Sequence, residues 1–351
     1  MNLVLGLTKA GRLHEATRSI QKALRHDASP AEIRVDLETD HRLRPLRPLG
    51  EVVAKLGKMT PKLQRNTKPP KLTIPAGAKF LDGSFTCAAG TRAYKLYVPS
   101  YSPVHPRGLI VMLHGCTQNS ADFAAGTRMN DLAEIEGMLV VYPNQTTHAN
   151  SSGCWNWFNP RDQNHGQGEP SIIAGITTEV MATYNIDPHQ VFIAGLSAGG
   201  AMAVVMGHTY PNLYSAVGVH SGLPYQSAND VISAFAAMRG EIRNHSPQLK
   251  PRVIVFHGDA DKTVHPSNAL AMMNSDNRRA AETIEGVSVG GIKYTRTIIE
   301  DQNKTPLSEV WLMHGAGHAW SGGSPAGSYT DSKGPDASKE IMKFFLKRRE
   351  S

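Results

Sequence analysis

The sequence has few cysteines and no cysteine pair at metal-ligand spacing. Cys87, Cys116 and Cys154 are the three cysteines of the 351 residues, and this odd, small number excludes a disulfide-rich scaffold. None of them forms a C-x-x-C pair, so a zinc site of that type is excluded. We therefore expect a protein without a metal.

Long apolar runs are also missing. No stretch of the sequence approaches the about 18 consecutive apolar residues of a membrane span. The first apolar run, Leu3–Leu7, has no basic stretch before it and is shorter than the core of a signal peptide. The sequence thus predicts a cytoplasmic protein, with an extracellular location as the alternative.

Charged residues make up only 19% of the chain, and the positive charges are concentrated near its start. Residues 1–71 carry 15 Lys and Arg against 7 Asp and Glu, whereas the remainder carries 22 against 23. Such a basic arm is suited to an anionic surface, although a solvated leader is the simpler interpretation. Aromatic residues do not alternate with these charges, so we expect no nucleic-acid partner.

Composition divides the chain into residues 1–72, a basic N-terminal arm and linker, and residues 73–351, a catalytic domain. In the arm, apolar residues recur at helical spacing within "GRLHEATRSIQKALRH". The stretch "TPKLQRNTKPPKLTIPAG" is typical of an extended linker. The oligomeric state cannot be derived from these patterns.

Apolar strand-like runs alternate with helical segments beyond this linker. Two strands around a glycine-containing turn are expected in "AKFLDGSFTCAAGTRAYKLYVP". Further strands are expected in "GLIVMLHG", "MLVVYPN", "QVFIAGLS", "AVGVHSG", "RVIVFHGDAD" and "EVWLMHGAGH", and helices in "SADFAAGTRMNDLAEIEG", "EPSIIAGITTEVMATYN", "GGAMAVVMGHTYP" and "DASKEIMKFFLKRR". Continuous apolar strands need cover on both faces. We therefore predict an α/β fold with a mostly parallel central sheet and helices on both faces.

Five residues in the strand-to-helix stretch "VFIAGLSAGGAMA" form the pattern G-x-S-x-G around Ser197. This pattern is typical of a nucleophile elbow, a tight turn that exposes a serine hydroxyl and therefore needs small neighbours. A plain strand-to-helix turn is the alternative. The loop of "LIVMLHGCTQN" would supply one oxyanion-hole N–H and the residue after the serine the other. We assign these donors to Cys116 and Ala198, with Thr117 as the substitute for Cys116.

Two later strands end in polar clusters where an acid and a base are expected. In "VIVFHGDADKTVHPSN", we favour Asp261 over Asp259 as the acid because it lies further out on the loop. In "VWLMHGAGHAWSGG", we favour His318 over His314 because its glycine-rich loop can reach back over the serine. The resulting order, Ser197, Asp261 and His318, is the serine, acid, histidine order of α/β hydrolases.

Aromatic residues follow the same strand edge. We expect Trp155, Trp157 and Trp320 to contact an apolar substrate, with core packing as the alternative for each. Thr117 is grouped with them as a substrate-binding residue. Cys116 and Cys154 both follow strands at this edge, so a disulfide between them is open, although a reducing cytoplasm would oppose it.

With these motifs, residues 75–348 resemble the poly(3-hydroxybutyrate) depolymerase-type esterases, the type 1 catalytic domains of short-chain-length polyhydroxyalkanoate depolymerases. The resemblance rests on "LHGCTQN", "CWNWF", "GLSAGGAM", "HGDAD" and "GHAWSGG". It implies an α/β-hydrolase fold related to feruloyl and acetylxylan esterases, and the same triad. Secreted members carry a signal peptide, which is not visible here, so the resemblance favours amorphous intracellular granules or smaller soluble esters.

The sequence therefore predicts a serine carboxylesterase or polyester depolymerase that needs no cofactor and works through an acyl-enzyme. Its expected substrate is poly(3-hydroxybutyrate) or its oligomers, and its arm, residues 1–72, would contact a polyhydroxyalkanoate granule or another anionic surface. Feruloyl, acetylxylan and general short-chain esterases are the alternatives with the same chemistry. An alternative of another class is a non-catalytic granule-surface binding protein.

Overall fold

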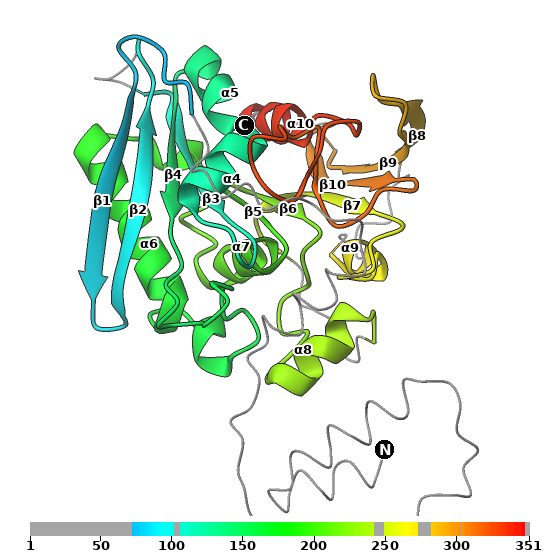
Figure 1. Cartoon of the computed structure of the whole chain (residues 1–351), viewed down its shortest axis with the longest axis horizontal. Coiled ribbons are helices and arrows are strands. Elements are labelled where there is room, and N and C mark those ends of the chain that lie inside the picture. The colour runs from blue at the N-terminus through cyan, green and yellow to red at the C-terminus, as the bar shows by residue number, and fades with distance from the viewer. Residues whose placement is uncertain (1–71, 102–105, 242–248, 273–281, 303, 348–351) are drawn as a thin grey trace, which may run out of the picture. The chain divides into compact units, whose positions relative to one another are not determined.

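The computed structural model describes residues 72–101, 106–241, 249–272, 282–302 and 304–347. These residues form a ten-stranded sheet in the order β1-β2-β4-β3-β5-β6-β7-β10-β9-β8, with β1 and β8 at its opposite edges (Figure 1). The strands are β1 Lys79–Cys87, β2 Gly90–Val98, β3 Gly108–Leu113, β4 Met138–Pro143, β5 Val191–Leu196, β6 Ala216–His220, β7 Arg252–Gly258, β8 Glu282–Val287, β9 Lys293–Glu300 and β10 Pro306–Met313.

The central strands from β4 to β10 are parallel to one another, and the strands at both edges are antiparallel. Strand β3 shows why its apolar run forms a central strand. Leu109, Val111 and Leu113 pack into the core on one face, and Ile110 and Met112 pack into the core on the other. Because successive side chains alternate between faces, a strand covered on both sides must be apolar throughout.

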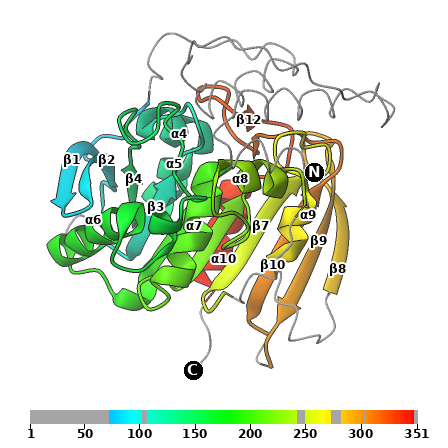
Figure 2. The same ribbon diagram turned by 90° about the horizontal axis from the view of Figure 1, so that it is seen from below.

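Helices cover both faces of the sheet. Helices α6 (Gly168–Tyr184) and α7 (Ala198–Thr209) contribute to one core, and α5 (Met129–Glu136) and α10 (Ala337–Leu346) contribute to the other. Figure 2 shows α6 and α7 in front of the sheet and α10 behind it. The remaining α-helices are α4 Ser120–Thr127, α8 Val231–Met238 and α9 Ser267–Ala271. Two short 3-10 helices are η1 Pro160–Gln163 and η2 Pro188–Gln190. Strands β11 Trp320–Ser321 and β12 Thr330–Asp331 form a separate two-stranded sheet. The predicted α/β architecture is confirmed.

Several elements differ from the sequence-based expectation. The single helix expected over residues 120–137 is two helices, because Arg128 adopts a left-handed backbone (φ 56°) between α4 and α5. Strands β8 and β9 and helix α8 were not expected. Residues 1–71 of the predicted arm, residues 1–72, lie outside the described residues, so its helix, its linker and the domain boundary after residue 72 stay predictions. Within the described residues, no helix is long and apolar enough to cross a membrane.

The carboxyl ends of the parallel strands gather the candidate residues at one edge of the sheet. Strand β3 ends just before His114, β5 just before Ser197, and β6 at His220. Strand β7 ends three residues before Asp261, and β10 five residues before His318. Ligands bind at this edge in open α/β sheets. The fold therefore brings together candidate residues from His114 to His318, which are more than two hundred positions apart in the chain.

Candidate active site

Ser197 occupies a strained turn between β5 and α7. Its backbone has φ 56° and ψ −120°, a region that non-glycine residues rarely adopt and that is concentrated at functional sites. Two hydrogen bonds hold the turn: Ser197 N–H donates to His220 O (2.8 Å), and Ala201 N–H donates to Ser197 O (2.9 Å). The residue is half-buried. The turn thus presents one serine at the start of a helix.

Glycines beside Ser197 allow main chains to touch. A Cβ on Gly199 would lie 2.1 Å from Leu113 O, and a Cβ on Gly195 would lie 2.3 Å from Gly199 O. Both distances are far below any real Cβ contact, so only glycine fits. The small residues of the motif therefore let α7 pack directly against the ends of β3 and β5.

Buried Asp261 and half-buried His318 form a hydrogen-bonded pair. The Asp261 carboxylate accepts from His318 Nδ1 (2.7 Å), and its other oxygen accepts from Thr263 N–H (2.8 Å) and Val264 N–H (3.0 Å). Burial would raise the Asp261 pKa, but the charge and hydrogen bond of His318, with His257 and Val264 N–H, lower it to about 2. The ionised carboxylate fixes the proton on Nδ1, which leaves Nε2 of His318 as a proton acceptor.

The two competing residues form a separate pair. Asp259 accepts from His314 Nδ1 (2.9 Å) and from Gly315 N–H (2.6 Å), and His314 Nε2 is bonded to Thr295 Oγ1 (2.8 Å). Both ring nitrogens of His314 are therefore engaged, so it has no free acceptor for a serine proton. Asp259 ties the ends of β7 and β10 together.

His220 links the elbow to the loop of His318. Its carbonyl accepts from Ser197 N–H, and its Nε2 accepts from Ser321 N–H (3.0 Å). Burial, and then the nearby imidazoles of His257 and His318, hold the His220 pKa well below its ordinary value. The ring is thus neutral, with the Nδ1 proton donated to Ser221 Oγ (3.1 Å). His220 is the functional residue that our sequence reasoning missed, and its place at the carboxyl end of a predicted strand was the available signal.

The predicted oxyanion donors lie on two backbones beside Ser197. A Cβ on Gly115 would be 3.6 Å from the Ser197 Cβ, which places the loop of Cys116 against the elbow. Ala198 is the first residue of α7, where amide N–H groups have no partner within the helix. Within the described part of the chain, neither the Cys116 nor the Ala198 N–H donates to a protein acceptor. Thr117 N–H instead donates to Ser152 O (2.8 Å), so it is engaged and does not serve as the substitute.

The aromatic residues predicted to contact substrate are buried. Trp155 and Trp320 are 0% and 1% exposed, and Trp157 is 6% exposed. Trp320 stacks on His220 (5.2 Å between ring centroids), and Trp155 lies 5.8 Å from the ring of His114. The expectation that these aromatics contact substrate is corrected: core packing describes all three, with Trp155 and Trp157 in one core cluster and Trp320 in the other.

Thr117 is the one predicted substrate residue at the surface. Its Oγ1 is hydrogen-bonded to the hydroxyl of Tyr329 (3.1 Å), and both residues have left-handed backbones, with φ of 65° and 53°. Tyr329 O also accepts from Trp320 N–H (2.7 Å). The loop of Cys116 and the loop of His318 are therefore joined across one tyrosine.

Cys116 and Cys154 form a disulfide across 38 residues, which settles the pairing that the sequence left open. Cys87 is the free cysteine of the described residues. No cluster of three or more His, Cys, Asp or Glu residues suited to a metal ion occurs in the described ranges. The groups at this edge are those that acyl transfer needs: a hydroxyl, an imidazole held by a carboxylate, and two backbone N–H groups.

Comparison with known proteins agrees with this chemistry. Poly(3-hydroxyalkanoate) depolymerase C of Paucimonas lemoignei is 34% identical over 240 residues, covering 63% of this chain and 57% of that protein. A probable acetylxylan esterase A of Aspergillus fumigatus is 33% identical over 200 residues, covering 51% of this chain and 53% of that protein. Feruloyl esterase B of Neurospora crassa is 31% identical over 230 residues, with 59% and 77% covered. The chain thus spans just over half the length of the first two relatives.

A solved structure supports the fold. The acetyl xylan esterase from Aspergillus awamori superimposes with a TM-score of 0.61 at 21% identity, covering 76% of this chain and 98% of that one. A family model described as esterase PHB depolymerase matches residues 92–279, which is more than half of the 351 residues. The chain therefore has the α/β-hydrolase fold of these carboxylic ester hydrolases and belongs to the esterase PHB depolymerase family.

Proposed function

We propose that the protein is a serine carboxylesterase that hydrolyses short-chain-length polyhydroxyalkanoate, or its oligomers, through an acyl-enzyme. The observation that carries this proposal is the hydrogen bond of 2.7 Å between buried Asp261 and His318, which is tied through His220 to the strained Ser197 elbow. A carboxylate that holds an imidazole, which in turn takes the proton of a serine hydroxyl, activates that serine for attack on an ester.

In the proposed mechanism, Ser197 Oγ attacks the ester carbonyl carbon while His318 Nε2 takes the hydroxyl proton. The Cys116 and Ala198 N–H groups donate to the oxyanion of the tetrahedral intermediate. His318 then gives its proton to the leaving alkoxide, which leaves Ser197 acylated. Water, deprotonated by the same imidazole, attacks the acyl-enzyme and releases the acid.

The relatives supply the substrate hypothesis. The polyhydroxyalkanoate depolymerase of Paucimonas lemoignei supports a polyester substrate. A second candidate is an acetylxylan esterase, because nearly the whole Aspergillus awamori enzyme, 98% of its chain, superimposes on this fold. The two candidate substrates differ in the alcohol that leaves when the ester is cleaved. In the polyester it is the hydroxyl end of a hydroxyacyl chain, and in acetylxylan it is a sugar hydroxyl.

A substrate panel tests the proposal. The intact protein and Ser197→Ala are assayed on amorphous poly(3-hydroxybutyrate) granules, 3-hydroxybutyrate oligomers, acetylated xylan, methyl ferulate and p-nitrophenyl butyrate. We expect granule and oligomer turnover that Ser197→Ala abolishes while its circular dichroism stays unchanged. Activity confined to acetylated xylan would favour the second candidate. Failure of a fluorophosphonate probe to label the intact protein would support a non-catalytic granule-binding protein.

Location and the arm are part of this proposal. The Cys116–Cys154 disulfide supports an oxidising compartment over the reducing cytoplasm that the sequence favoured. Alkylation of free thiols in freshly lysed cells would test this: one modified cysteine is expected if the disulfide persists and three if it does not. Granule binding through residues 1–72 is tested by deleting them and measuring sedimentation with granules.

A further inference from the structure

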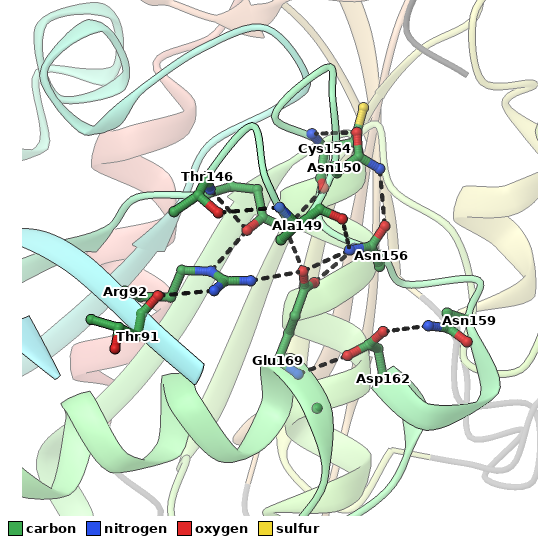
Figure 3. Close-up of polar contacts among 12 residues, drawn as sticks. Thr91, Arg92, Thr146, Ala149, Asn150, Cys154, Asn156, Asn159, Asp162 and Glu169 are labelled. Atoms are coloured by element: carbon green, nitrogen blue, oxygen red, sulfur yellow. Dashed lines mark hydrogen bonds and ion pairs between the residues drawn. The ribbon is translucent and has the colours of Figure 1, made fainter. Parts of the chain in front are cut away.

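A buried carboxylate outside the proposed triad is surrounded by hydrogen-bond donors (Figure 3). Glu169, the second residue of α6, is 3% exposed. One carboxylate oxygen accepts from Asn156 N–H (2.7 Å). The other accepts from Asn156 Nδ2 (2.8 Å) and Gln145 Nε2 and faces Arg92 NH2 at 3.4 Å. Every group within hydrogen-bond distance of the carboxylate oxygens donates, so the ionised carboxylate is the form that satisfies all of these donors.

Charges of both signs face Glu169. Burial is the largest effect and raises its pKa, and the charge of Asp162 raises it further. The hydrogen bonds from Asn156 and Gln145 and the charge of Arg92 act in the opposite direction, and the pKa is about 7. Asp162 itself accepts from Glu169 N–H (2.7 Å) and from Asn159 Nδ2 (2.8 Å).

Gln145 connects this carboxylate to the loop of the proposed oxyanion donor. Its side chain accepts from Arg92 Nε (2.8 Å) and donates to Glu169, while its backbone N–H donates to His114 Nε2 (3.1 Å). His114 is fully buried, and burial lowers its pKa to about 4, so the ring is neutral. Because Nε2 accepts, the proton is on Nδ1, which donates to Gly115 O (2.8 Å).

A second connection leads from Gln145 to Cys116 through Cys154. Gln145 Nε2 also donates to Cys154 O (3.0 Å), and Cys154 is joined to Cys116 by the disulfide. Asn156, whose N–H and side chain both donate to Glu169, holds Asn150 through a 2.9 Å hydrogen bond. Asn150 Oδ1 in turn accepts from Ser152 N–H and Cys154 N–H. The carboxylate therefore organises the segment to which Cys116 is covalently bound.

We propose that Glu169 is a positioning residue that acts through Gln145 and the 150–156 segment to aim the Cys116 N–H at the oxyanion. This inference rests on the proposed esterase function. It adds Glu169 to the residues on which turnover depends, although Glu169 lies 28 positions before Ser197 and outside every catalytic motif of the sequence. Misplacing a transition-state donor by about 1 Å is enough to cost on the order of 100-fold in rate. A carboxylate that never touches substrate can thus control turnover.

The test compares Glu169→Gln with a matched control, Glu309→Gln. Glu309 is equally buried at 2% exposure and pairs with Arg296 through two hydrogen bonds (2.8 and 2.9 Å), but it lies on β10. In Glu169→Gln an NH2 group replaces one acceptor oxygen and faces donors. The rate on p-nitrophenyl butyrate is expressed per fluorophosphonate-labelled Ser197, and inhibition by butaneboronic acid reports binding of a tetrahedral oxyanion mimic.

We expect Glu169→Gln to lower kcat per labelled site by about 10- to 100-fold, to weaken boronate inhibition in proportion, and to change KM little. Glu309→Gln should lower the melting temperature while keeping kcat and boronate inhibition. If Glu169→Gln fails to fold, Gln145→Met, which removes the link but leaves Glu169 with Arg92 and Asn156, should give the same loss of kcat. Unchanged kcat and boronate inhibition in the folded variant would overturn the positioning role. A wild-type protein that is neither labelled nor active would instead overturn the proposed function itself.

Discussion

At the scale of single residues, two Asp–His pairs stand beside each other but differ in what they leave free. The Asp261–His318 pair has a fully buried carboxylate and leaves Nε2 of His318 without a protein partner among the described residues. The Asp259–His314 pair is more exposed and uses both imidazole nitrogens. Hydrogen bonding thus separates two pairs that sequence spacing alone left as competitors.

Asp261→Asn should therefore lower kcat by about 10³- to 10⁴-fold, because an amide no longer fixes the Nδ1 proton of His318 or stabilises the imidazolium. Asp259→Asn is the matched control, because it breaks the neighbouring Asp259–His314 pair, two residues from Asp261 and four from His318, without touching the His318 imidazole. Steady-state kinetics on p-nitrophenyl butyrate measures both. A larger loss in Asp259→Asn than in Asp261→Asn would reverse the assignment.

At the scale of elements, the junction of α7 with β3 depends on direct contact between main chains. Gly199→Ala would force a methyl group against Leu113 O and His114 O, at 2.1 and 2.5 Å. Overpacking of this kind costs about 1–3 kcal/mol or more, and the displaced helix would move Ser197. We expect a lower melting temperature together with a loss of activity.

The control for this change lies in the same helix. Gly207→Ala would meet only side-chain ends, Leu249 Cδ2 and Val217 Cγ2, both at 2.8 Å. The end of the Leu249 side chain can move, whereas the β-branched Val217 moves less freely, and alanine favours a helix over glycine by about 1 kcal/mol. Thermal melts of both variants, with activity per folded protein, are the measurement. Equal effects of the two substitutions would show that backbone contact at the elbow is unimportant.

The Cys116–Cys154 disulfide also connects separate elements, because it closes a loop of 38 residues between the end of β3 and the segment before η1. In the chain-entropy account, a loop of this length stabilises the folded state by about 4 kcal/mol. We expect Cys116→Ala with Cys154→Ala to lower the free energy of unfolding by about that amount, measured by urea denaturation without reductant. Wild-type protein in reductant should approach the variant, and a variant as stable as oxidised wild type would contradict this account.

At the scale of the whole molecule, the sequence was informative where burial alone decides structure. Strands β3 to β7 and β10 are apolar on both faces, so a continuous run such as "GLIVML" specified them. Strands β8 and β9 are half-exposed at the sheet's edge, and "ETIEGV" has no such run. The break at Arg128 depends on one backbone rotation that no residue type demanded.

The site divides in the same way. Ser197, Asp261 and His318 could be proposed because each follows a strand in a fixed order along the chain. His220, Glu169 and the tryptophans could not be placed, because their roles depend on partners far away in sequence, 101 residues in the His220–Ser321 bond and 77 in the Arg92–Glu169 pair. Such contacts exist only once the loops have packed, so the partners could not be derived from the chain, although the place of His220 at the end of a predicted strand could have marked that one residue.

The stability of the whole molecule should depend on pH through Glu169. Its pKa is raised from 4.5 to about 7, so between these values the folded protein binds more protons than the unfolded chain. The stabilisation is therefore fully present below 4.5 and is lost as pH rises through 7, by about 3 kcal/mol in all. Glu169→Gln lacks this titration. Urea denaturation of both proteins from about pH 4 to pH 8 should show wild type losing stability relative to the variant as pH rises, and a constant difference would mean that Glu169 titrates alike in both states.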